Sequence, residues 1–144
     1  MKILVLNGPN LNMLGVREED IYGSETLEDI EVKILEIAKE SGCEVSFFQS
    51  NAEHELIESI HQAFEDNTDA IIFNPAGYTH TSVALRDAIL AVQIPFFEVH
   101  ISDINSREDF RKKSYFSDIA KEVFSGHGTE SYILAFKEAL KINR

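Results

Sequence analysis

Glu98 and His100 are the two residues of this sequence whose types and spacing most directly suggest proton-transfer chemistry. They lie within the largely apolar stretch FFEVHIS, which has the character of a buried strand. Residues two apart on a strand point to the same face, so the carboxylate can orient the imidazole and raise its pKa. A carboxylate in a buried strand is costly without a partner, which weakens a purely structural interpretation. The pair therefore indicates a histidine that acts as a general acid.

A second group of candidates follows the first apolar run of the chain, beginning with NGPNLN at residues 7–12. Asn10 and Asn12 offer amide groups that could hold a developing oxyanion. Arg17 and Tyr22 lie further along, in a segment rich in charge and glycine. Tyrosine, with a pKa of about 10, is a poor base at neutral pH, but a guanidinium within about 4–6 Å lowers that pKa. Closure of this segment over a substrate would bring the pair together, whereas the plain alternative is a surface loop with a packed tyrosine.

The third candidate segment is NPAGYTHTS at residues 74–82. Pro75 and Gly77 favour a turn where a strand ends, and the Thr–Ser pair at 81–82 can cap the helix that follows. Backbone amides exposed in such a turn can bind a carboxylate or a hydroxyl group. His80 could serve as a ligand, as an acid or simply as a capping partner.

Other charged residues give weaker indications. Arg107 and Arg111 are four positions apart and could clamp anionic or hydroxylated groups. Arg86 and Asp87 lie about one turn beyond the third segment, and the plain interpretation is that they belong to a solvated helix face.

Three of the five histidines, His54, His61 and His127, carry no functional indication, since the first two are expected to face solvent and the third lies between glycines. No Cys/His cluster or HExxH motif suggests a metal site. The phosphate-binding pattern GxxxxGK[ST] is absent, and GxG occurs only at residues 126–128, too late for a dinucleotide-binding fingerprint.

Short apolar runs alternate along the chain with segments of helical period. The strands are expected at residues 3–6, 45–48, 70–73, 96–101 and 123–124, and the helices at 27–41, 56–64, 83–91, 109–112 and 130–141. Thr26 and Asp29 resemble a capping box at the start of the first helix. The alternation predicts a parallel sheet with helices on both faces.

Five strands in 144 residues favour a flavodoxin-like doubly wound α/β fold, with strand order 2-1-3-4-5 and a single domain over residues 1–144. Ligands of such folds bind beyond the carboxyl ends of the strands, near the switch point of the strand order. NGPNLN, NPAGYTH and EVHIS follow the first, third and fourth strands, so the three polar segments are expected to converge.

Composition limits the classes of partner. The net charge of −12 and the pI of about 4.7 argue against nucleic acid or an anionic membrane. No apolar run reaches the roughly 18 residues of a transmembrane helix, and no signal peptide is recognised at the N-terminus. The single Cys43 cannot form an internal disulfide, which suits a reducing cytoplasm.

A non-catalytic flavodoxin-like module, binding flavin or making a signalling contact, is the alternative from another class. A flavin site would require a loop rich in Ser, Thr and Gly after the first strand, where this chain has Pro9 and three asparagines. A signalling receiver domain would require paired acids at the same place, where this chain has Asn7 and Gly8.

Four stretches, in this order, carry a resemblance to a known family: NGPNLNMLGVRE with IYG, NPAGYTHTSVALRDA, FFEVHISDINSREDFRKKS and GHGTESYILAF. Over essentially the whole chain the sequence resembles the type II 3-dehydroquinate dehydratases. The resemblance implies a hydro-lyase that converts 3-dehydroquinate to 3-dehydroshikimate by anti elimination through an enolate. The reaction would belong to the shikimate pathway of aromatic amino acid biosynthesis or to the quinate pathway. The resemblance further implies a cytoplasmic homododecamer of four trimers, without cofactor or metal.

The resemblance also implies roles for residues of the first segment. Tyr22 would be the base that removes the C2 proton of the substrate, and Arg17 would activate it. Both would lie on a mobile lid at about residues 15–23. Asn12 would help to stabilise the enolate oxygen.

For the remaining segments, the resemblance implies that His100, oriented by Glu98, donates a proton to the departing C1 hydroxyl. The implied substrate contacts are Asn74, His80, Ile101, Ser102 and Arg111. The backbone amides at 101–102 would meet the substrate carboxylate. Asp87 would reach into the site of a neighbouring subunit, and this replaces its interpretation as part of a solvated helix face.

Overall fold

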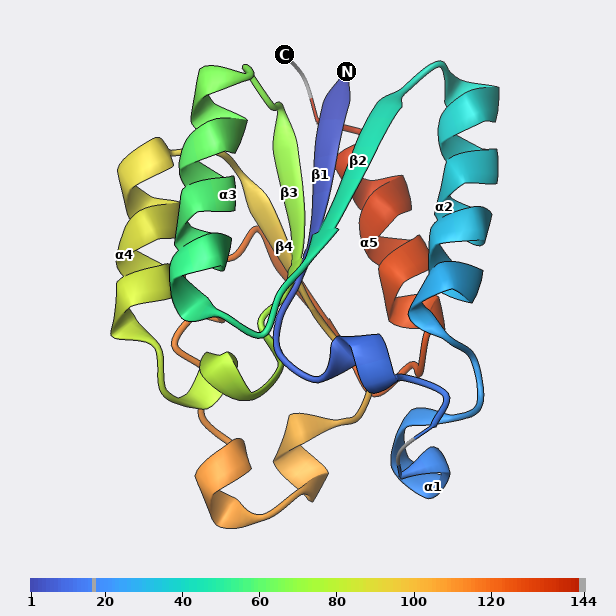
Figure 1. The fold of residues 1–144 in the computed structure, drawn as a ribbon, viewed down its shortest axis with the longest axis vertical. Coiled ribbons are helices and arrows are strands. Elements are labelled where there is room, and N and C mark those ends of the chain that lie inside the picture. Colours follow the sequence, from blue (N-terminus) through green and yellow to red (C-terminus); the bar gives the residue numbers. More distant parts are fainter. Residues whose placement is uncertain (17, 143–144) are drawn as a thin grey trace.

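The sheet at the centre of the molecule has the predicted order and direction (Figure 1). The computed structural model describes residues 1–16 and 18–142, apart from the side chains of residues 19 and 22. All strand pairs are parallel, in the order β2-β1-β3-β4-β5. The strands are β1 (Lys2–Asn7), β2 (Glu44–Gln49), β3 (Ala70–Asn74), β4 (Phe96–His100) and β5 (Glu122–Ser125). The doubly wound class predicted from the sequence is confirmed.

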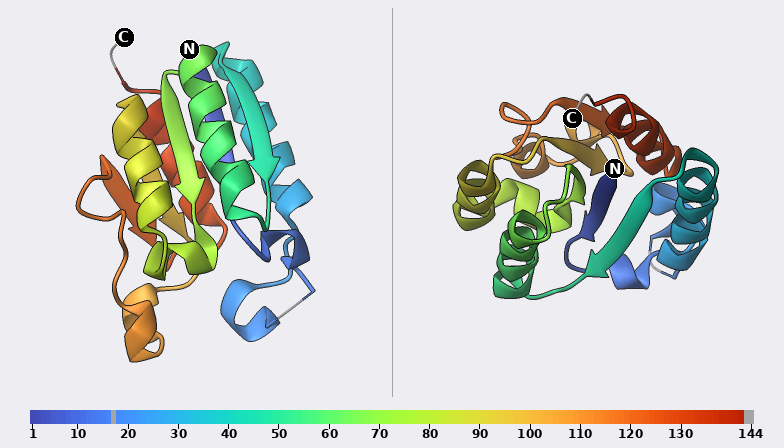
Figure 2. Two further views of the ribbon diagram at one scale, coloured as in Figure 1. Left: turned by 60° about the vertical axis from the view of Figure 1, so that its left-hand side comes forward. Right: turned by 90° about the horizontal axis from the view of Figure 1, so that it is seen from above.

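In the described part of the chain, four longer helices cover the two faces of the sheet (Figure 2). α2 (Leu27–Ser41) and α5 (Glu130–Ala139) lie on one face, and α3 (Glu53–Glu65) and α4 (Val83–Val92) lie on the other. A short helix, α1 (Glu19–Tyr22), precedes α2. Among the described residues, no helix has both the length and the hydrophobicity that a bilayer crossing requires.

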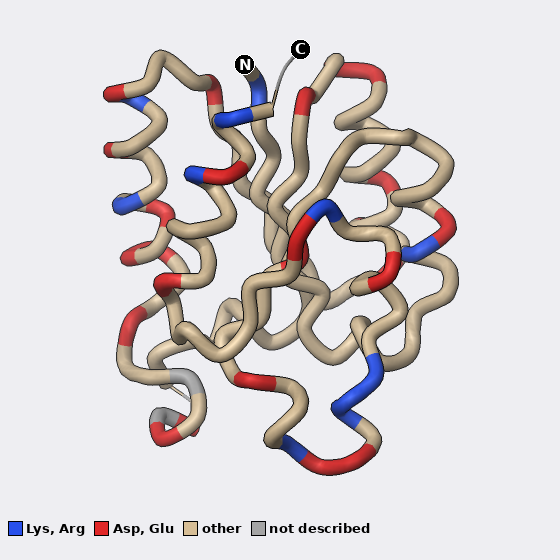
Figure 3. The backbone as a smooth tube through the Cα atoms, turned by 180° about the vertical axis from the view of Figure 1, so that it is seen from behind, with Lys and Arg blue, Asp and Glu red and all other residues tan. Residues whose placement is uncertain are grey.

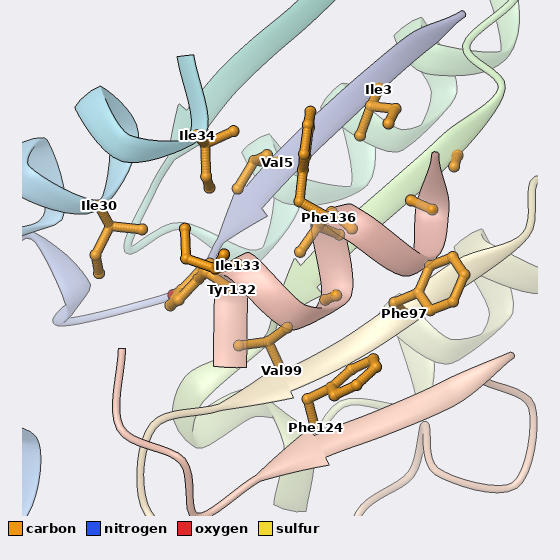
Figure 4. Close-up of a cluster of buried hydrophobic side chains, with 14 of the residues drawn as sticks. Ile3, Val5, Ile30, Ile34, Phe97, Val99, Phe124, Tyr132, Ile133 and Phe136 are labelled. Atoms are coloured by element: carbon orange, nitrogen blue, oxygen red, sulfur yellow. The ribbon is translucent and has the colours of Figure 1, made fainter. Parts of the chain in front are cut away.

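Alternation along the strands divides the apolar core into two clusters. In β1, Ile3 and Val5 pack toward α2 and α5, whereas Leu4 and Leu6 pack toward α3 and α4. Figure 4 shows the first of these clusters. Each such side chain contributes about 1.5–3 kcal/mol through burial, so both faces stabilise the central strands and hold their ends in place.

Side-chain caps fix the starts of α2 and α4. Thr26 and Asp29 form the predicted capping box of α2, with both reciprocal hydrogen bonds present. The Ser82 hydroxyl accepts the Leu85 backbone N–H at 2.9 Å and so caps α4, as expected for the Thr–Ser pair. A cap of this kind is worth about 1 kcal/mol.

The element boundaries differ from the predictions by a few residues. α3 begins at Glu53, ahead of its first apolar position, because its first turn is polar and carries no hydrophobic period. β4 ends at His100, one residue early, because the chain turns at Ile101. The predicted helix at 109–112 is a 3-10 turn, and three further 3-10 turns were not predicted. These turns are η1 (Leu11–Met13), η2 (Ala76–His80), η3 (Ile104–Ser106) and η4 (Asp109–Arg111).

Candidate active site

A cavity of about 190 Å³ lies where the three polar segments meet, at the carboxyl ends of β1, β3 and β4. Its described lining comes from residues Pro9, Asn10, Leu11, Asn74, Ala76, Gly77, His80, His100, Ile101, Ser102, Ile104, Arg107 and Arg111. The structure thus brings together the strand exits that the sequence predicted to converge.

The exits of β1 and β3 are fastened to each other by backbone contact. The Gly8 N–H donates to the Asn74 carbonyl at 2.8 Å. A Cβ atom at Gly8 would lie 2.3 Å from the carbonyl oxygen of Pro75, so no other residue fits without separating the two loops. Asn10 and Ala76 adopt φ of 69° and 54°, a conformation that costs non-glycine residues energy and that is concentrated at functional sites.

The Glu98–His100 pair is the part of the site suited to proton transfer. His100 lines the cavity and is 5% exposed, whereas Glu98 lies behind it and is fully buried. The two are hydrogen-bonded through His100 Nε2 and Glu98 Oε2, as their position on one face of the strand predicted.

Hydroxyl groups from the segment after η4 hold the buried carboxylate. Ser114 Oγ donates to Oε2 of Glu98 at 2.7 Å, and Ser117 Oγ donates to Oε1 at 2.8 Å. Burial raises the pKa of Glu98, but the hydrogen bonds from His100 and the two serines outweigh burial and set that pKa below its ordinary value. Because the ionised carboxylate only accepts, His100 Nε2 carries a proton and Nδ1 is the nitrogen left for a ligand.

His80 contributes a neutral imidazole to the same cavity. Its Nδ1 lies 2.7 Å from the Lys113 carbonyl, which can only accept, so Nδ1 is the protonated nitrogen. Burial lowers the pKa of His80, and the nearby positive charges of His100 and the arginines lower it further. In the neutral ring Nε2 is an acceptor, suited to a substrate hydroxyl group.

Two arginines make one side of the cavity basic. Arg107 donates from Nη1 to the Ser102 hydroxyl at 3.1 Å, and Arg111 donates from Nε to Glu108 Oε2 at 3.0 Å. The described residues that line the cavity include no Asp or Glu, although the whole chain has a net charge of −12. Figure 3 shows the loop that carries these arginines at the end of the molecule opposite the N-terminus. Both arginines pair with the single carboxylate of Glu108, at 3.6 and 3.0 Å, so one positive charge of the two is left to favour a ligand that carries a carboxylate.

The structure places most of the predicted site residues in the cavity, and some outside it. Its lining includes the predicted residues Asn74, His80, His100, Ile101, Ser102 and Arg111. Asn12 is exposed in η1, beside the lining residue Leu11, but does not itself line the cavity. Asp87 is exposed on α4, away from the described lining. Tyr22 ends α1, and its side chain and Arg17 lie outside the described residues.

Sequence reasoning missed several contributors. Leu11, Ala76 and Gly77 stand inside the polar segments at 7–12 and 74–82, but they carry no polar side chain and so were not proposed as contacts. Ile104 lies in an irregular loop with no periodic signal. The hydroxyls of Ser114 and Ser117 also gave no signal, because their role depends on contacts with a distant strand.

No metal site is visible in the described part of the chain: no group of three or more His, Cys, Asp or Glu side chains is arranged to hold an ion. The prediction that no metal takes part is left for experiment.

Comparison with known proteins gives consistent similarities over nearly the whole chain. The family model described as dehydroquinase class II matches residues 1–140. A protein of Methylococcus capsulatus named 3-dehydroquinate dehydratase is 61% identical over 140 residues, covering 97% of this chain and 95% of the relative. One of the same name from Hahella chejuensis is 56% identical, covering 95% and 93%. A crystal structure of type II dehydroquinase from Butyrivibrio crossotus superposes with a TM-score of 0.94 at 45% identity, covering 96% and 97%.

Proposed function

The chain belongs to the dehydroquinase class II family, and from this membership we propose how its cavity dehydrates 3-dehydroquinate to 3-dehydroshikimate. The activity is that of a 3-dehydroquinate dehydratase, a hydro-lyase of the shikimate or quinate pathway. One observation carries the mechanism: His100, hydrogen-bonded to the buried Glu98 behind it, lines a cavity that Arg107 and Arg111 also line.

The reaction is an anti elimination in two steps. A base removes the proton from C2, and the electron pair of the broken C–H bond forms an enolate with the C3 carbonyl. The enolate then re-forms the carbonyl and expels the C1 hydroxyl, which leaves as water with a proton from His100. Exchange with solvent returns the base and His100 to their starting states, so atoms and charge balance.

The described residues support the second step. His100 Nε2 is committed to Glu98, which leaves Nδ1 to deliver the proton, and ionised Glu98 stabilises the charged imidazolium before delivery. The substrate carboxylate is assigned to the backbone amides at 101–102, beside Arg111. Asn74 and His80 are assigned to the substrate's oxygen atoms.

Tyr22 is proposed as the base of the first step, with Arg17 lowering its pKa and Asn12 stabilising the enolate oxygen. These assignments rest on the resemblance to the family, and the sequence supports them in that Arg17 and Tyr22 lie within a segment rich in charge and glycine. We assign the lid to about residues 15–23 of a single catalytic domain that spans residues 1–144.

Assembly and location complete the proposal. We propose a cytoplasmic homododecamer of four trimers in which Asp87, exposed on α4, reaches the site of a neighbouring subunit. No cofactor, metal, nucleic acid or membrane takes part. Light scattering coupled to size exclusion tests the assembly, and a monomer would contradict it.

The central experiment follows the absorbance of the conjugated enone after 3-dehydroquinate is added. Tyr22→Phe is expected to lower kcat by about 10²–10⁴-fold, the usual worth of a general base, while the protein still binds substrate. Tyr115→Phe, a tyrosine outside the described cavity lining, is the control and should retain wild-type kcat. Near wild-type turnover of Tyr22→Phe would overturn the assignment of the base.

Two further treatments separate this chemistry from others. EDTA and borohydride should leave the activity unchanged, because neither a metal nor a lysine imine is proposed. Inactivation by borohydride in the presence of substrate would indicate imine chemistry instead. A flavin absorbance spectrum of the purified protein would favour the binding-module alternative.

A further inference from the structure

Tyr132 carries a polar group into the apolar core between α5 and the sheet (Figure 4). The side chain is fully buried, among residues such as Ile30 and Ile133. Its hydroxyl lies 2.6 Å from Oδ1 of Asn7 and 2.9 Å from Nδ2 of Asn74. A phenylalanine would fill the same volume, as Phe136 does one turn further along the helix, so the hydroxyl needs its own explanation.

The two asparagines are the last residues of β1 and β3 and lie opposite each other in the sheet register. Both point to the α5 face, and both are almost fully buried. Asn74 also lines the cavity, whereas Asn7 is not among its described lining residues. Tyr132 therefore joins a cavity residue to a residue of the supporting core.

One backbone group fixes the direction of every hydrogen bond in this chain of contacts. The Ala76 N–H can only donate, and it lies 3.0 Å from Asn74 Oδ1, which is thereby the acceptor. The other amide atom, Nδ2, must then donate to the Tyr132 hydroxyl, which in turn donates to Asn7. Burial raises the pKa of Tyr132 far above its ordinary value, so the hydroxyl keeps its proton throughout the working pH range.

We propose that Tyr132 is a positioning residue, whose hydroxyl holds the Asn74 amide so that its second N–H is presented to the substrate. This inference rests on the proposed function, in which Asn74 contacts the substrate. Because protein groups engage both Oδ1 and one N–H, the Asn74 amide cannot rotate or flip. Its orientation is therefore fixed before substrate binds, and binding costs no rotational freedom of this side chain. The role concerns binding and not proton transfer, because neither amide nor the protonated hydroxyl titrates.

Tyr132→Phe tests the proposal through the division between KM and kcat. It is expected to raise KM about tenfold, which corresponds to one lost buried hydrogen bond, and to leave kcat within about twofold of wild type. Phe136→Leu is the matched control, since it perturbs a fully buried ring on the same helix that makes no hydrogen bond. The control should lower Tm while leaving KM unchanged, with both variants assayed well below their Tm.

A double-mutant cycle with Asn74→Ala identifies the route of the effect. Asn74→Ala alone should raise KM, and adding Tyr132→Phe should raise it no further, because the amide to be positioned is gone. If the increases in KM of the two single variants multiply in the double variant, the proposal is overturned. An unchanged KM for Tyr132→Phe, or an equal change in KM for Phe136→Leu, would also overturn it.

Two further results, a Tyr132→Phe variant that does not fold and an inactive wild type, need their own interpretation. If Tyr132→Phe does not fold, Asn7→Ala takes its place, because Asn7 is outside the described cavity lining and its side chain is linked to Asn74 through the Tyr132 hydroxyl. An unchanged KM in that variant also overturns the proposal. A wild-type protein that fails to dehydrate 3-dehydroquinate would refute the proposed function itself, whereas an active wild type with an unaffected Tyr132→Phe refutes only the positioning role.

Discussion

The two faces of the sheet support one cavity with different chemistry. On the face toward α3 and α4, β4 places the ionisable pair Glu98 and His100, whose carboxylate is held by serine hydroxyls. On the face toward α5, β1 and β3 end in Asn7 and Asn74, neutral amides joined by Tyr132. Strand alternation thus separates the groups proposed to transfer protons from those proposed only to orient the substrate, although both lie at the carboxyl ends of neighbouring strands.

The cost of burial explains why the two faces are built differently. A buried carboxylate needs several donors, and Glu98 receives them from an imidazole and hydroxyl groups of a distant segment. A neutral amide needs fewer, and the contacts of Tyr132 and Ala76 suffice for Asn74. Substitutions on the first face should therefore affect kcat and depend on pH, and those on the second should affect KM and should not.

His100→Ala should have the largest effect. Removing the general acid is expected to lower kcat by about 10²–10⁴-fold, with substrate affinity changed little. Enone absorbance gives kcat, and calorimetric titration of the inactive variant gives the affinity. A variant that lost affinity but kept kcat would break the division between the two faces.

Glu98→Gln should have the next largest effect. Replacing the carboxylate with a neutral amide weakens a charged hydrogen bond and is expected to lower kcat about 10- to 100-fold.

The same variant tests how the stability of the protein depends on pH. Because the pKa of folded Glu98 is below its ordinary value, its contribution is fully present above about pH 5 and is lost as the pH falls through the lowered pKa.

Urea denaturation at pH 6 and pH 4 measures that contribution. Wild type should lose more of its free energy of unfolding over this interval than Glu98→Gln, which lacks the titrating group. Equal losses in the two proteins would mean that Glu98 is not held ionised by its neighbours.

Asn7→Ala should have the smallest effect on activity and a pH-independent effect on stability. It leaves the buried Tyr132 hydroxyl without its acceptor and is expected to lower the free energy of unfolding by about 1–3 kcal/mol. The loss should be equal at pH 6 and pH 8, because the raised pKa of Tyr132 keeps the hydroxyl neutral at both. A loss that changed with pH would show that the α5 face is coupled to a titrating group.

The sequence was most informative where local pattern decides structure. Apolar periodicity was enough to predict the strand order, since five buried runs separated by amphipathic helices leave few topologies. The same strand period placed Glu98 and His100 on one face, and their hydrogen bond confirms it. The convergence of three polar segments followed from the general rule for ligand sites in doubly wound sheets.

The parts that could not be predicted depend on contacts between distant residues. Tyr132 stands in an amphipathic helix, where an aromatic residue is ordinarily part of the core, and nothing nearby indicates a partner 58 positions away. Ser114 and Ser117 lie in an irregular segment and reach Glu98 only after the sheet is complete. The 3-10 turns of the loops lack the length that would give a hydrophobic period.

The hydrogen bond between Tyr132 and Asn7 spans 125 positions of the chain. During synthesis at about 5–20 residues per second, Tyr132 is added roughly 6 to 25 s after Asn7. Throughout that interval the end of the first strand can satisfy its amide oxygen only with water or with a transient partner. The last helix therefore completes the first strand, and a nascent chain has no finished cavity until almost all of its residues have been polymerised.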